Sequence, residues 1–188
     1  QRPQNYRPVG ATAAPEAAIA QAAQLLAGAA RPVIIAGGGI KNTGTGDKAM
    51  ALAEVFNAPV VSSPGHGDAV PFGHQLNAGQ MGPRGNVVAS RLVKEADVIL
   101  ALGTRIGFNA TFYSYDNINQ DAKIIHVEQE PTAIGRYFPV EMGIWGDAPT
   151  VTDQLRLAGK KLACRAEADA WTQTYKAERA AYLAKRDA

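Results

Sequence analysis

Short runs of apolar residues alternate along this chain with longer segments whose apolar positions recur at helical spacing. The apolar runs predict strands at Val33–Ala36, Pro59–Ser63, Asp97–Leu102, Lys123–Val127 and Met142–Trp145. The segments with helical spacing predict helices at Glu16–Ala29, Gly44–Phe56, Asn86–Ala96 and Pro149–Leu162, and a short helical turn at Thr132–Gly135. This alternation predicts an α/β fold with three layers, α/β/α, in which a doubly wound parallel sheet carries helices on both faces.

The two ends of the chain differ from this pattern. Residues 1–14 contain proline and glycine without periodicity and are expected to form a linker. Residues 15–163 form the predicted central nucleotide-binding domain, and residues 164–188 are predicted to be a helical connector or tail outside the core. The segments Phe72–Gly85 and Ile106–Asp121 are expected to be loops. Because the chain starts at Gln1 rather than Met, we expect it to be a piece of a larger protein.

Every predicted strand ends in small or polar residues. These residues are Gly37, Gly38 and Gly39; Ser63, Pro64 and Gly65; Gly103, Thr104 and Arg105; Glu128 and Gln129; and Asp147. The carboxyl ends of parallel strands share one edge of a sheet, which is where α/β sheets bind ligands. There the glycines would leave backbone N–H groups bare for a flat or charged ligand. Arg105 could pair a diphosphate, and Glu128 or Asp147 could accept hydrogen bonds from ribose hydroxyls.

This pattern predicts a nucleotide site, although glycine-rich turns and a surface arginine would also explain it without a ligand. A dinucleotide fingerprint is not satisfied, because Asn42 stands where its third glycine would follow Gly37. The looser match at Gly44–Ala49 begins too far after the strand and is expected to open the helix. The sequence also contains no Gly-Lys-Ser/Thr triplet, so a phosphate-binding P-loop is excluded.

We find no catalytic or metal-binding constellation in the sequence. His66, His74 and His126 are too far apart for a helical metal pair. His66 and His74 lie in candidate ligand loops, whereas His126 is expected to be a hydrogen-bonded core residue. Cys164 has no histidine partner nearby and is not expected to act as a nucleophile. We therefore predict no catalytic residue and no metal ligand in this chain.

Composition narrows the possible partners. Hydrophobic residues make up 46% of the chain and charged residues 19%, which is ordinary for a folded domain. The net charge of +2 is small and scattered, so neither nucleic acid nor a membrane is expected as a partner. The single cysteine cannot form an internal disulfide, and such a low cysteine content is typical of cytoplasmic proteins.

The order of the motifs along residues 15–160 resembles the central domain of thiamine-diphosphate-dependent enzymes. The motifs are PVIIAGGG (32–39), APVVSS (58–63) with GDAVP (67–71), GPRG (82–85), ADVILALGTR (96–105), AKIIHVE (122–128), and IG (134–135) followed by GDA (146–148). Within that superfamily the chain is most similar to acetolactate synthase and sulfoacetaldehyde acetyltransferase. The segment His66–Pro71 and the helical tail resemble the latter.

The resemblance implies a six-stranded parallel sheet of the Rossmann-like, DHS-like nucleotide-binding type, and therefore one further strand, which we expect near Phe112. In that family this domain binds FAD or ADP, or has lost its ligand. The domains on either side bind thiamine diphosphate and Mg²⁺. The whole enzyme would act on a 2-oxo acid or sulfoacetaldehyde as a homodimer or homotetramer. Gly146-Asp147-Ala148 departs from the family's Gly-Asp-Gly metal motif, so this chain alone is expected to catalyse nothing.

The resemblance also implies which residues would contact a flavin or adenine nucleotide. They are Gly37, Gly38, Gly39, Ser63, Pro64, Gly65, Gly82, Gly103, Thr104, Arg105, Glu128, Gln129, Asp147 and Ala148. Gly107 and Asn109 stand where acetolactate synthases tend to have Asp and Arg, and Glu128 replaces their usual Asp. FAD, ADP, coenzyme A and an empty structural site therefore all stay open. The alternatives to this family are an NAD(P)-binding domain of a sirtuin-like or transhydrogenase-like protein, and a purely structural spacer.

Overall fold

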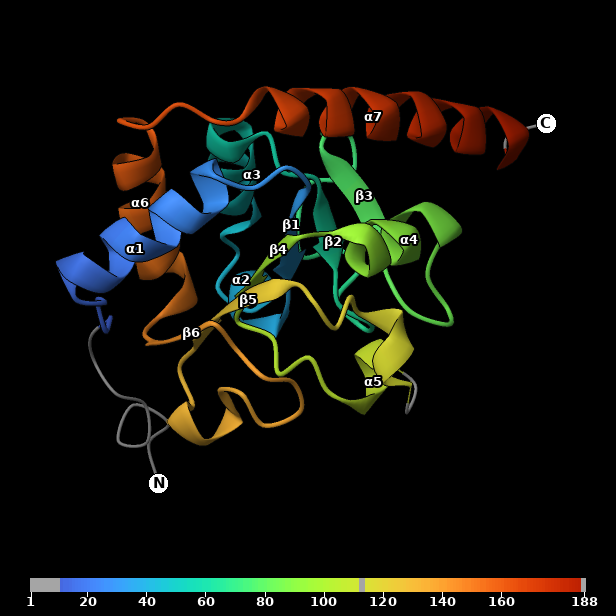
Figure 1. The fold of residues 1–188 in the computed structure, drawn as a ribbon. Helices are drawn as coiled ribbons and strands as arrows, with labels where there is room; N and C mark the ends of the chain where they lie inside the picture. The colour runs from blue at the N-terminus through green and yellow to red at the C-terminus, as the bar shows by residue number, and fades with distance from the viewer. Residues whose placement is uncertain (1–10, 112–113, 187–188) are drawn as a thin grey trace.

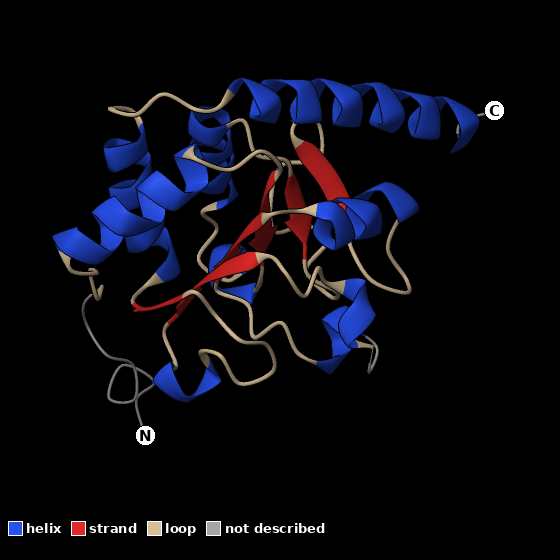
Figure 2. Cartoon of the chain, in the orientation of Figure 1, coloured by secondary structure: helices blue, strands red, loops and turns tan. Residues whose placement is uncertain are grey.

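The computed structural model describes residues 11–111 and 114–186, which form one six-stranded parallel sheet between two layers of helices (Figures 1 and 2). The strands are β1 (Pro32–Ala36), β2 (Val60–Ser62), β3 (Asn77–Gln80), β4 (Val98–Leu102), β5 (Lys123–Glu128) and β6 (Met142–Trp145). Their order across the sheet is β3-β2-β1-β4-β5-β6, and all pairs are parallel. The predicted three-layer, doubly wound fold is confirmed.

The helices divide between the two faces of the sheet. Helices α1 (Glu16–Ala27), α3 (Gly46–Phe56) and α6 (Ala148–Gly159) pack on one face, and α4 (Val87–Glu95) and α7 (Ala166–Arg186) pack on the other. The short elements are α2 (Gly38–Lys41), α5 (Phe108–Thr111), η2 (Tyr115–Asn117) and η3 (Pro131–Ala133). Gly44 has φ +66° and separates α2 from α3, so the single helix expected from Gly44 begins instead at Gly46.

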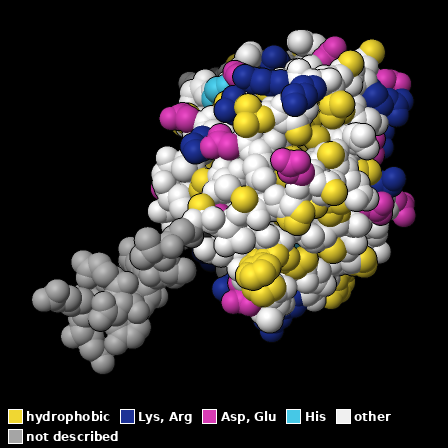
Figure 3. All heavy atoms as spheres, turned by 90° about the vertical axis from the view of Figure 1, so that its left-hand side faces the viewer, with side chains coloured by type: hydrophobic (Ala, Val, Ile, Leu, Met, Phe, Trp, Pro, Cys, Tyr) yellow, Lys and Arg dark blue, Asp and Glu magenta, His cyan; other side chains and the backbone are white. Residues whose placement is uncertain are grey.

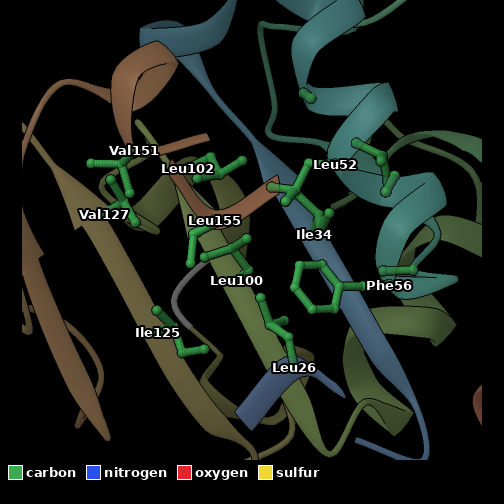
Figure 4. Packing of buried hydrophobic residues seen from close by; sticks show 14 of the residues in the cluster. Leu26, Ile34, Leu52, Phe56, Leu100, Leu102, Ile125, Val127, Val151 and Leu155 are labelled. Atoms are coloured by element: carbon green, nitrogen blue, oxygen red, sulfur yellow. The ribbon is translucent and has the colours of Figure 1, made fainter. Parts of the chain in front are cut away.

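The central strands β1 and β4 are apolar throughout because both of their faces are buried. In β1, Ile34 packs with the core beneath α1, α3 and α6, while Val33 and Ile35 pack with the core beneath α4 and α7. Successive side chains of a strand point to opposite faces, so one continuous apolar run serves two cores. Figure 4 shows the first core, where Leu100 and Phe56 lie between strands and helices.

The sixth strand lies where the sequence predicts a loop. Strand β3 (Asn77–Gln80) falls within Phe72–Gly85 and pairs with β2 at the edge of the sheet, with a register shift after Val60. The Asn77 amide fixes the local backbone, because it donates to the Pro71 carbonyl and accepts from the Gly79 N–H. The neighbouring Leu76, Ala78 and Met81 are buried. Phe112, where the extra strand is expected, lies outside the described residues. A short edge strand with one covered side needs no apolar run, so the pattern did not reveal it.

Helix α7 belongs to the second core rather than lying outside it. Tyr175 is fully buried there, and Ala168 and Thr172 are buried beside it. The Thr172 hydroxyl donates to the Asn57 carbonyl, and the Trp171 indole N–H donates to the Pro32 carbonyl. These contacts fix the helix across the amino-terminal side of the sheet. The expectation of a tail outside the core is therefore wrong for this part of the helix.

The segment just before α1 is also anchored. Ala14 is buried, and its N–H and carbonyl both bond to the Gln154 amide of α6. The Thr12 carbonyl accepts a hydrogen bond from the Asp147 N–H. Residues 1–10 of the predicted linker lie outside the described residues.

Charges on the surface are mixed rather than segregated. Figure 3 shows basic and acidic side chains next to one another on one face of the molecule. Ion pairs occur between Lys48 and Asp153 and between Arg165 and Glu167. Within the described residues, no helix combines the length and the apolarity that crossing a membrane requires.

Tyr175 offers a test of how firmly α7 is held. Its hydroxyl is buried without a hydrogen-bond partner among the described residues, and burial raises its pKa. Tyr175→Phe should therefore leave the free energy of unfolding unchanged or raise it by up to about 1 kcal/mol, because no bond is lost. Tyr175→Ala should lower it by about 3–5 kcal/mol through the cavity that it creates. Urea unfolding of both variants measures this. A lower free energy of unfolding in Tyr175→Phe would mean that the hydroxyl has a hydrogen-bond partner.

Candidate functional site

The candidate site forms where β1 and β4 end side by side at the centre of the sheet. Ala36 of β1 pairs in register with Leu102 of β4, so Gly37 and Gly103 emerge next to each other. From β1 the sheet continues in one direction to β2 and in the other to β4, which makes this the point where the strand order reverses. In doubly wound sheets the helices that follow such strands diverge and leave a crevice.

The glycines at these two strand ends are required by close contact between the turns. A Cβ on Gly37 would lie 2.5 Å from the Gly103 oxygen, and a Cβ on Gly39 would lie 2.8 Å from the Gly103 Cα. Gly103 itself has φ +56°, and a Cβ there would lie 2.6 Å from the Gly39 Cα. Larger residues would therefore push β1 and β4 apart at the site.

The backbone N–H groups of these glycines are less available than expected. The Gly37 N–H donates to the Leu102 carbonyl at 3.0 Å, and the Gly39 N–H donates to the Gly103 carbonyl at 2.9 Å. These two groups join the turns to each other. The expectation of three bare N–H donors is thus wrong for Gly37 and Gly39. The glycines act here mainly by removing side-chain bulk.

A cleft of about 510 Å³ lies over these strand ends and brings together most of the predicted residues. From the predicted set it is lined by Gly38, Gly39, Ser63, Pro64, Gly103, Thr104, Arg105 and Glu128. These residues come from the carboxyl ends of β1, β2, β4 and β5. The cleft therefore lies over the strand ends at which the sequence places these residues.

The remaining predicted residues lie outside the lining of this cleft. Gly37 and Ala148 lie behind it, against the Gly103 turn. Gly65 and Gly82 have φ of +81° and +89° and form the turns at its rim. Gln129 is exposed, and its carbonyl accepts from the Trp145 indole N–H at 3.0 Å.

Asp147 has a structural role that differs from the expected contact with ribose. Its carboxylate caps α6 by accepting from the Thr150 N–H at 3.1 Å and the Thr150 hydroxyl at 2.7 Å. Asp is a preferred N-cap because its oxygen satisfies an N–H group that the helix cannot. No cluster of three or more His, Cys, Asp or Glu residues able to hold a metal ion occurs in the described ranges.

His126 supports the cleft from below. Its ring is buried in β5, where Nε2–H donates to the Thr104 carbonyl at 2.8 Å and Nδ1 accepts from the Gly135 N–H at 3.3 Å. This pair of bonds requires the neutral ring with the proton on Nε2, because Nδ1 accepts. Burial lowers the pKa of His126. The prediction of a hydrogen-bonded core histidine is confirmed.

The residues after Thr104 are held in an uncommon backbone conformation. Ile106 has φ +46° and is buried, and its N–H approaches the Thr104 hydroxyl at 3.4 Å. A β-branched residue rarely adopts this left-handed region, so the surrounding contacts must impose it. The turn leaves the Arg105 side chain exposed at the cleft while the neighbouring residues are buried.

Acidic side chains lie on one side of the cleft, at the end of β5. The Glu128 carboxylate folds back and accepts from the Gln129 N–H at 2.8 Å and the Glu130 N–H at 3.4 Å. Hydrogen bonds from Thr132 and, to a smaller extent, the charge of Arg105 lower the pKa of Glu130. Arg105 therefore faces acidic groups on one side and the glycine turns on the other.

Several residues that line the cleft are not in the predicted set, although the sequence had placed His66 in a candidate ligand loop and Gly107 and Asn109 near the expected flavin. They are Asn42, His66, Ile106, Gly107, Phe108, Asn109, Ala110 and Tyr137. Tyr137 comes from the segment after η3 and lies against Gly107, where a Cβ would be 3.4 Å from its ring. No spacing in the sequence connects residue 137 to this edge. The sequence does indicate His66, because it lies in the turn that follows β2.

A second lobe adjoins the cleft. It has a volume of about 490 Å³ and is lined by Pro64, Gly65, Gln80, Pro83, Arg84, Phe108 and Asn109. Pro64, Phe108 and Asn109 line both spaces, so they form the boundary between them. The cleft and the lobe together could hold a ligand with a polar part and a less polar extension.

Comparison with known proteins agrees with the motifs. The family model for the central domain of thiamine pyrophosphate enzymes matches residues 19–155. Sulfoacetaldehyde acetyltransferase of Castellaniella defragrans is 40% identical over 167 residues, covering 81% of this chain and 28% of the relative. A probable sulfoacetaldehyde acetyltransferase of Rhizobium meliloti is 42% identical, covering 79% and 25%.

A second group of relatives is similar at lower identity. The acetolactate synthase large subunit of Corynebacterium glutamicum is 35% identical over 150 residues, covering 80% of this chain and 24% of the relative. The chain thus spans about a quarter of the length of the curated relatives it matches.

His126 makes the stability of the site depend on pH. Its pKa is lower in the folded chain than in the unfolded chain, so the unfolded state binds more protons as the pH falls. The free energy of unfolding should therefore be highest above about pH 6.5 and decrease below it. His126→Gln should flatten this decrease, whereas His74→Gln, which alters an exposed pair with Glu54, should not. Denaturant unfolding at several pH values tests this. An unchanged pH profile in His126→Gln would contradict it.

Proposed function

The chain belongs to the central-domain family of thiamine pyrophosphate enzymes, and on that premise we propose that it is the nucleotide-binding domain of an enzyme that transfers a two-carbon unit. One observation carries the nucleotide proposal: the cleft at the strand-order reversal, where Gly38, Arg105 and Glu128 line one space. This is the position at which doubly wound sheets bind nucleotides.

The residues present suit an adenine nucleotide with a diphosphate. Gly38, Gly39 and Gly103 carry no side chain, so phosphates could approach the backbone closely. The Arg105 guanidinium can pair two phosphate oxygens at once. The Glu128 carboxylate can accept hydrogen bonds from ribose hydroxyls, because only part of it is used by its own backbone. These three contacts define the proposed binding mode.

We propose ADP ahead of FAD as the ligand. The acidic and basic side chains that acetolactate synthases tend to have near the flavin are replaced by Gly107 and Asn109, and both of these line the cleft. The adjoining lobe beside Phe108 could accept the less polar part of FAD, which is why FAD belongs in the same test. Coenzyme A shares the adenine diphosphate, and a spacer without ligand would bind none of them.

Sulfoacetaldehyde is the proposed substrate of the whole enzyme. The named sulfoacetaldehyde acetyltransferases are 38–43% identical to this chain, whereas the acetolactate synthases are 31–35% identical. A 2-oxo acid is the second candidate, because the acetolactate synthases belong to the same set of relatives. Both reactions transfer a two-carbon unit.

The chemical steps are proposed to occur in other domains of the whole protein. Thiamine diphosphate, when bound there with Mg²⁺, supplies the stabilised carbanion. Asp147 of the Gly146-Asp147-Ala148 segment is committed to capping α6, which supports a structural role for that segment. We propose a cytoplasmic homodimer or homotetramer whose amino-terminal and carboxy-terminal domains bind the thiamine cofactor.

Calorimetric titration of the chain with ADP, FAD and NADP tests the nucleotide proposal. We expect ADP to bind, and Arg105→Gln to weaken binding about tenfold because a charge-assisted pair is lost. Arg165→Gln is the matched control, since Arg165 pairs with Glu167 outside the cleft and should leave binding unchanged.

Two results would reject the nucleotide proposal. Tight binding of NADP without binding of ADP or FAD would favour the transhydrogenase-like alternative. Binding of none of these nucleotides by a folded chain would favour the structural spacer.

A charge-restoring variant tests why ADP is favoured over FAD. Gly107→Asp combined with Asn109→Arg should raise the affinity for FAD relative to ADP by about tenfold, through one added anion and one added cation in the cleft. The Asp side chain has room, because a Cβ at Gly107 would make only an ordinary contact with Tyr137 at 3.4 Å. Gly73→Asp adds a charge in open space and serves as the control. An unchanged FAD-to-ADP ratio would show that these positions do not select the ligand.

A further inference from the structure

His66 lies in the cleft with its ring fixed from behind. It follows β2 in a turn in which the His66 N–H donates to the Ser63 carbonyl at 3.0 Å. Ring atom Nδ1 lies 3.1 Å from the Pro64 carbonyl oxygen and 3.1 Å from the Ser63 hydroxyl. A carbonyl oxygen can only accept, so the contact with Pro64 places a proton on Nδ1. In the neutral ring, Nε2 is therefore the unprotonated nitrogen.

The Nε2 atom of His66 faces the glycine turn of the cleft. It lies 3.0 Å from the position that a Cβ on Gly38 would occupy, so a side chain at residue 38 would displace the ring. Gly38 lines the same cleft. The absence of a Cβ at this glycine thus allows the imidazole edge to lie next to the turn where phosphates are proposed to bind.

The positive charge in the cleft is small for a diphosphate. Arg105 is the only lysine or arginine that lines it within the described part of the chain. Lys41 of α2 is near, but its ammonium group pairs with Asp68 at 2.7 Å. The hydrogen bond from Lys41 lowers the pKa of Asp68, and the charge of His66 contributes to the same effect. Glu128, on the β5 side, adds a negative charge.

We propose that His66 is a second cationic contact for the bound diphosphate, as an imidazolium whose Nε2–H donates to a phosphate oxygen. The assignment rests on the proposed nucleotide function. It adds His66 to the residues that contact the diphosphate and couples binding to the uptake of a proton. A phosphate oxygen is an acceptor only, so it can bond to Nε2 only when that nitrogen carries a proton. Since Nδ1 is already protonated, binding takes up one proton from solvent, to the extent that the ring was neutral.

The assignment predicts a direction for the effect of pH. Histidine is the side chain whose charge changes between about pH 5 and 8. Binding stabilises the protonated ring, so affinity should rise as the pH falls through this range and level off at its acidic end. The charged groups near the ring are Arg105 and Glu128 in the lining of the cleft and the ion pair of Lys41 with Asp68.

Calorimetric titration with ADP, in pairs of buffers that differ in ionisation enthalpy, measures the proton uptake. The terminal phosphate of ADP also titrates in this range, so the informative quantity is the difference between the parent chain and His66→Gln. We expect the parent chain to take up more protons than this variant near pH 7. We expect His66→Gln to weaken binding about tenfold near pH 6 and hardly at all near pH 8.

Two further variants make the result specific. His74→Gln removes a histidine that pairs with Glu54 outside the cleft, and it should keep the full proton uptake. His66→Asn keeps an amide near the Nδ1 position, so it preserves the bond to Pro64 if loss of that bond should unfold the turn. It should lose the proton uptake as His66→Gln does.

The outcomes separate this assignment from the proposed function. Binding of ADP with equal proton uptake in the parent chain and both His66 variants would overturn the role of His66 and leave the nucleotide proposal standing. Equal loss of affinity at pH 6 and pH 8 would mean a neutral contact or a packing role, and would also overturn it. Failure of the folded parent chain to bind ADP at any pH would overturn the nucleotide proposal and this assignment together.

Discussion

The site depends on the absence of side chains at two neighbouring strand ends. β1 and β4 leave the sheet in register, and their turns are joined by the hydrogen bond from the Gly39 N–H to the Gly103 carbonyl. Gly37, Gly39 and Gly103 approach each other so closely that a Cβ on any of them would lie within 2.5–2.8 Å of another turn's atoms. Such contacts are too short for real side chains, so the cleft above them exists only because these residues are glycine.

The two histidines near the cleft, His126 and His66, differ in how many of their ring nitrogens are hydrogen-bonded inside the protein. His126 is buried, and both of its ring nitrogens are used by the Thr104 carbonyl and the Gly135 N–H, so it connects β5 to two loops that border the cleft. Among the contacts of the described residues, His66 uses Nδ1 in the turn after β2, and its other nitrogen faces Gly38. A histidine with both nitrogens bonded inside the protein can position neighbours, whereas one with a nitrogen in a cleft can contact a ligand.

Sequence reasoning succeeded where one physical signal dominated. The buried strands β1 and β4 are continuous apolar runs because two helical layers cover them, and burial on both faces requires such runs. It failed where polar or distant contacts decided the outcome. β3 contains the polar residues Asn77 and Gln80 and only a few apolar ones, so no apolar run marks it as a strand. Asp147 faces its own helix as a cap, although its position after a strand suggested a ligand.

The sequence by itself determined the layered fold, the residues that gather at one edge of the sheet, and the family through the order of its motifs. Only the tertiary structure decided that α7 buries Tyr175 in the second core, and that Tyr137 and His66 border the same cleft as Arg105. The reason is the range of each signal. Periodicity and motifs depend on residues close together in the sequence and so predict local structure. A cleft is lined by loops that are far apart in the sequence, and which loops meet depends on the register of the strands.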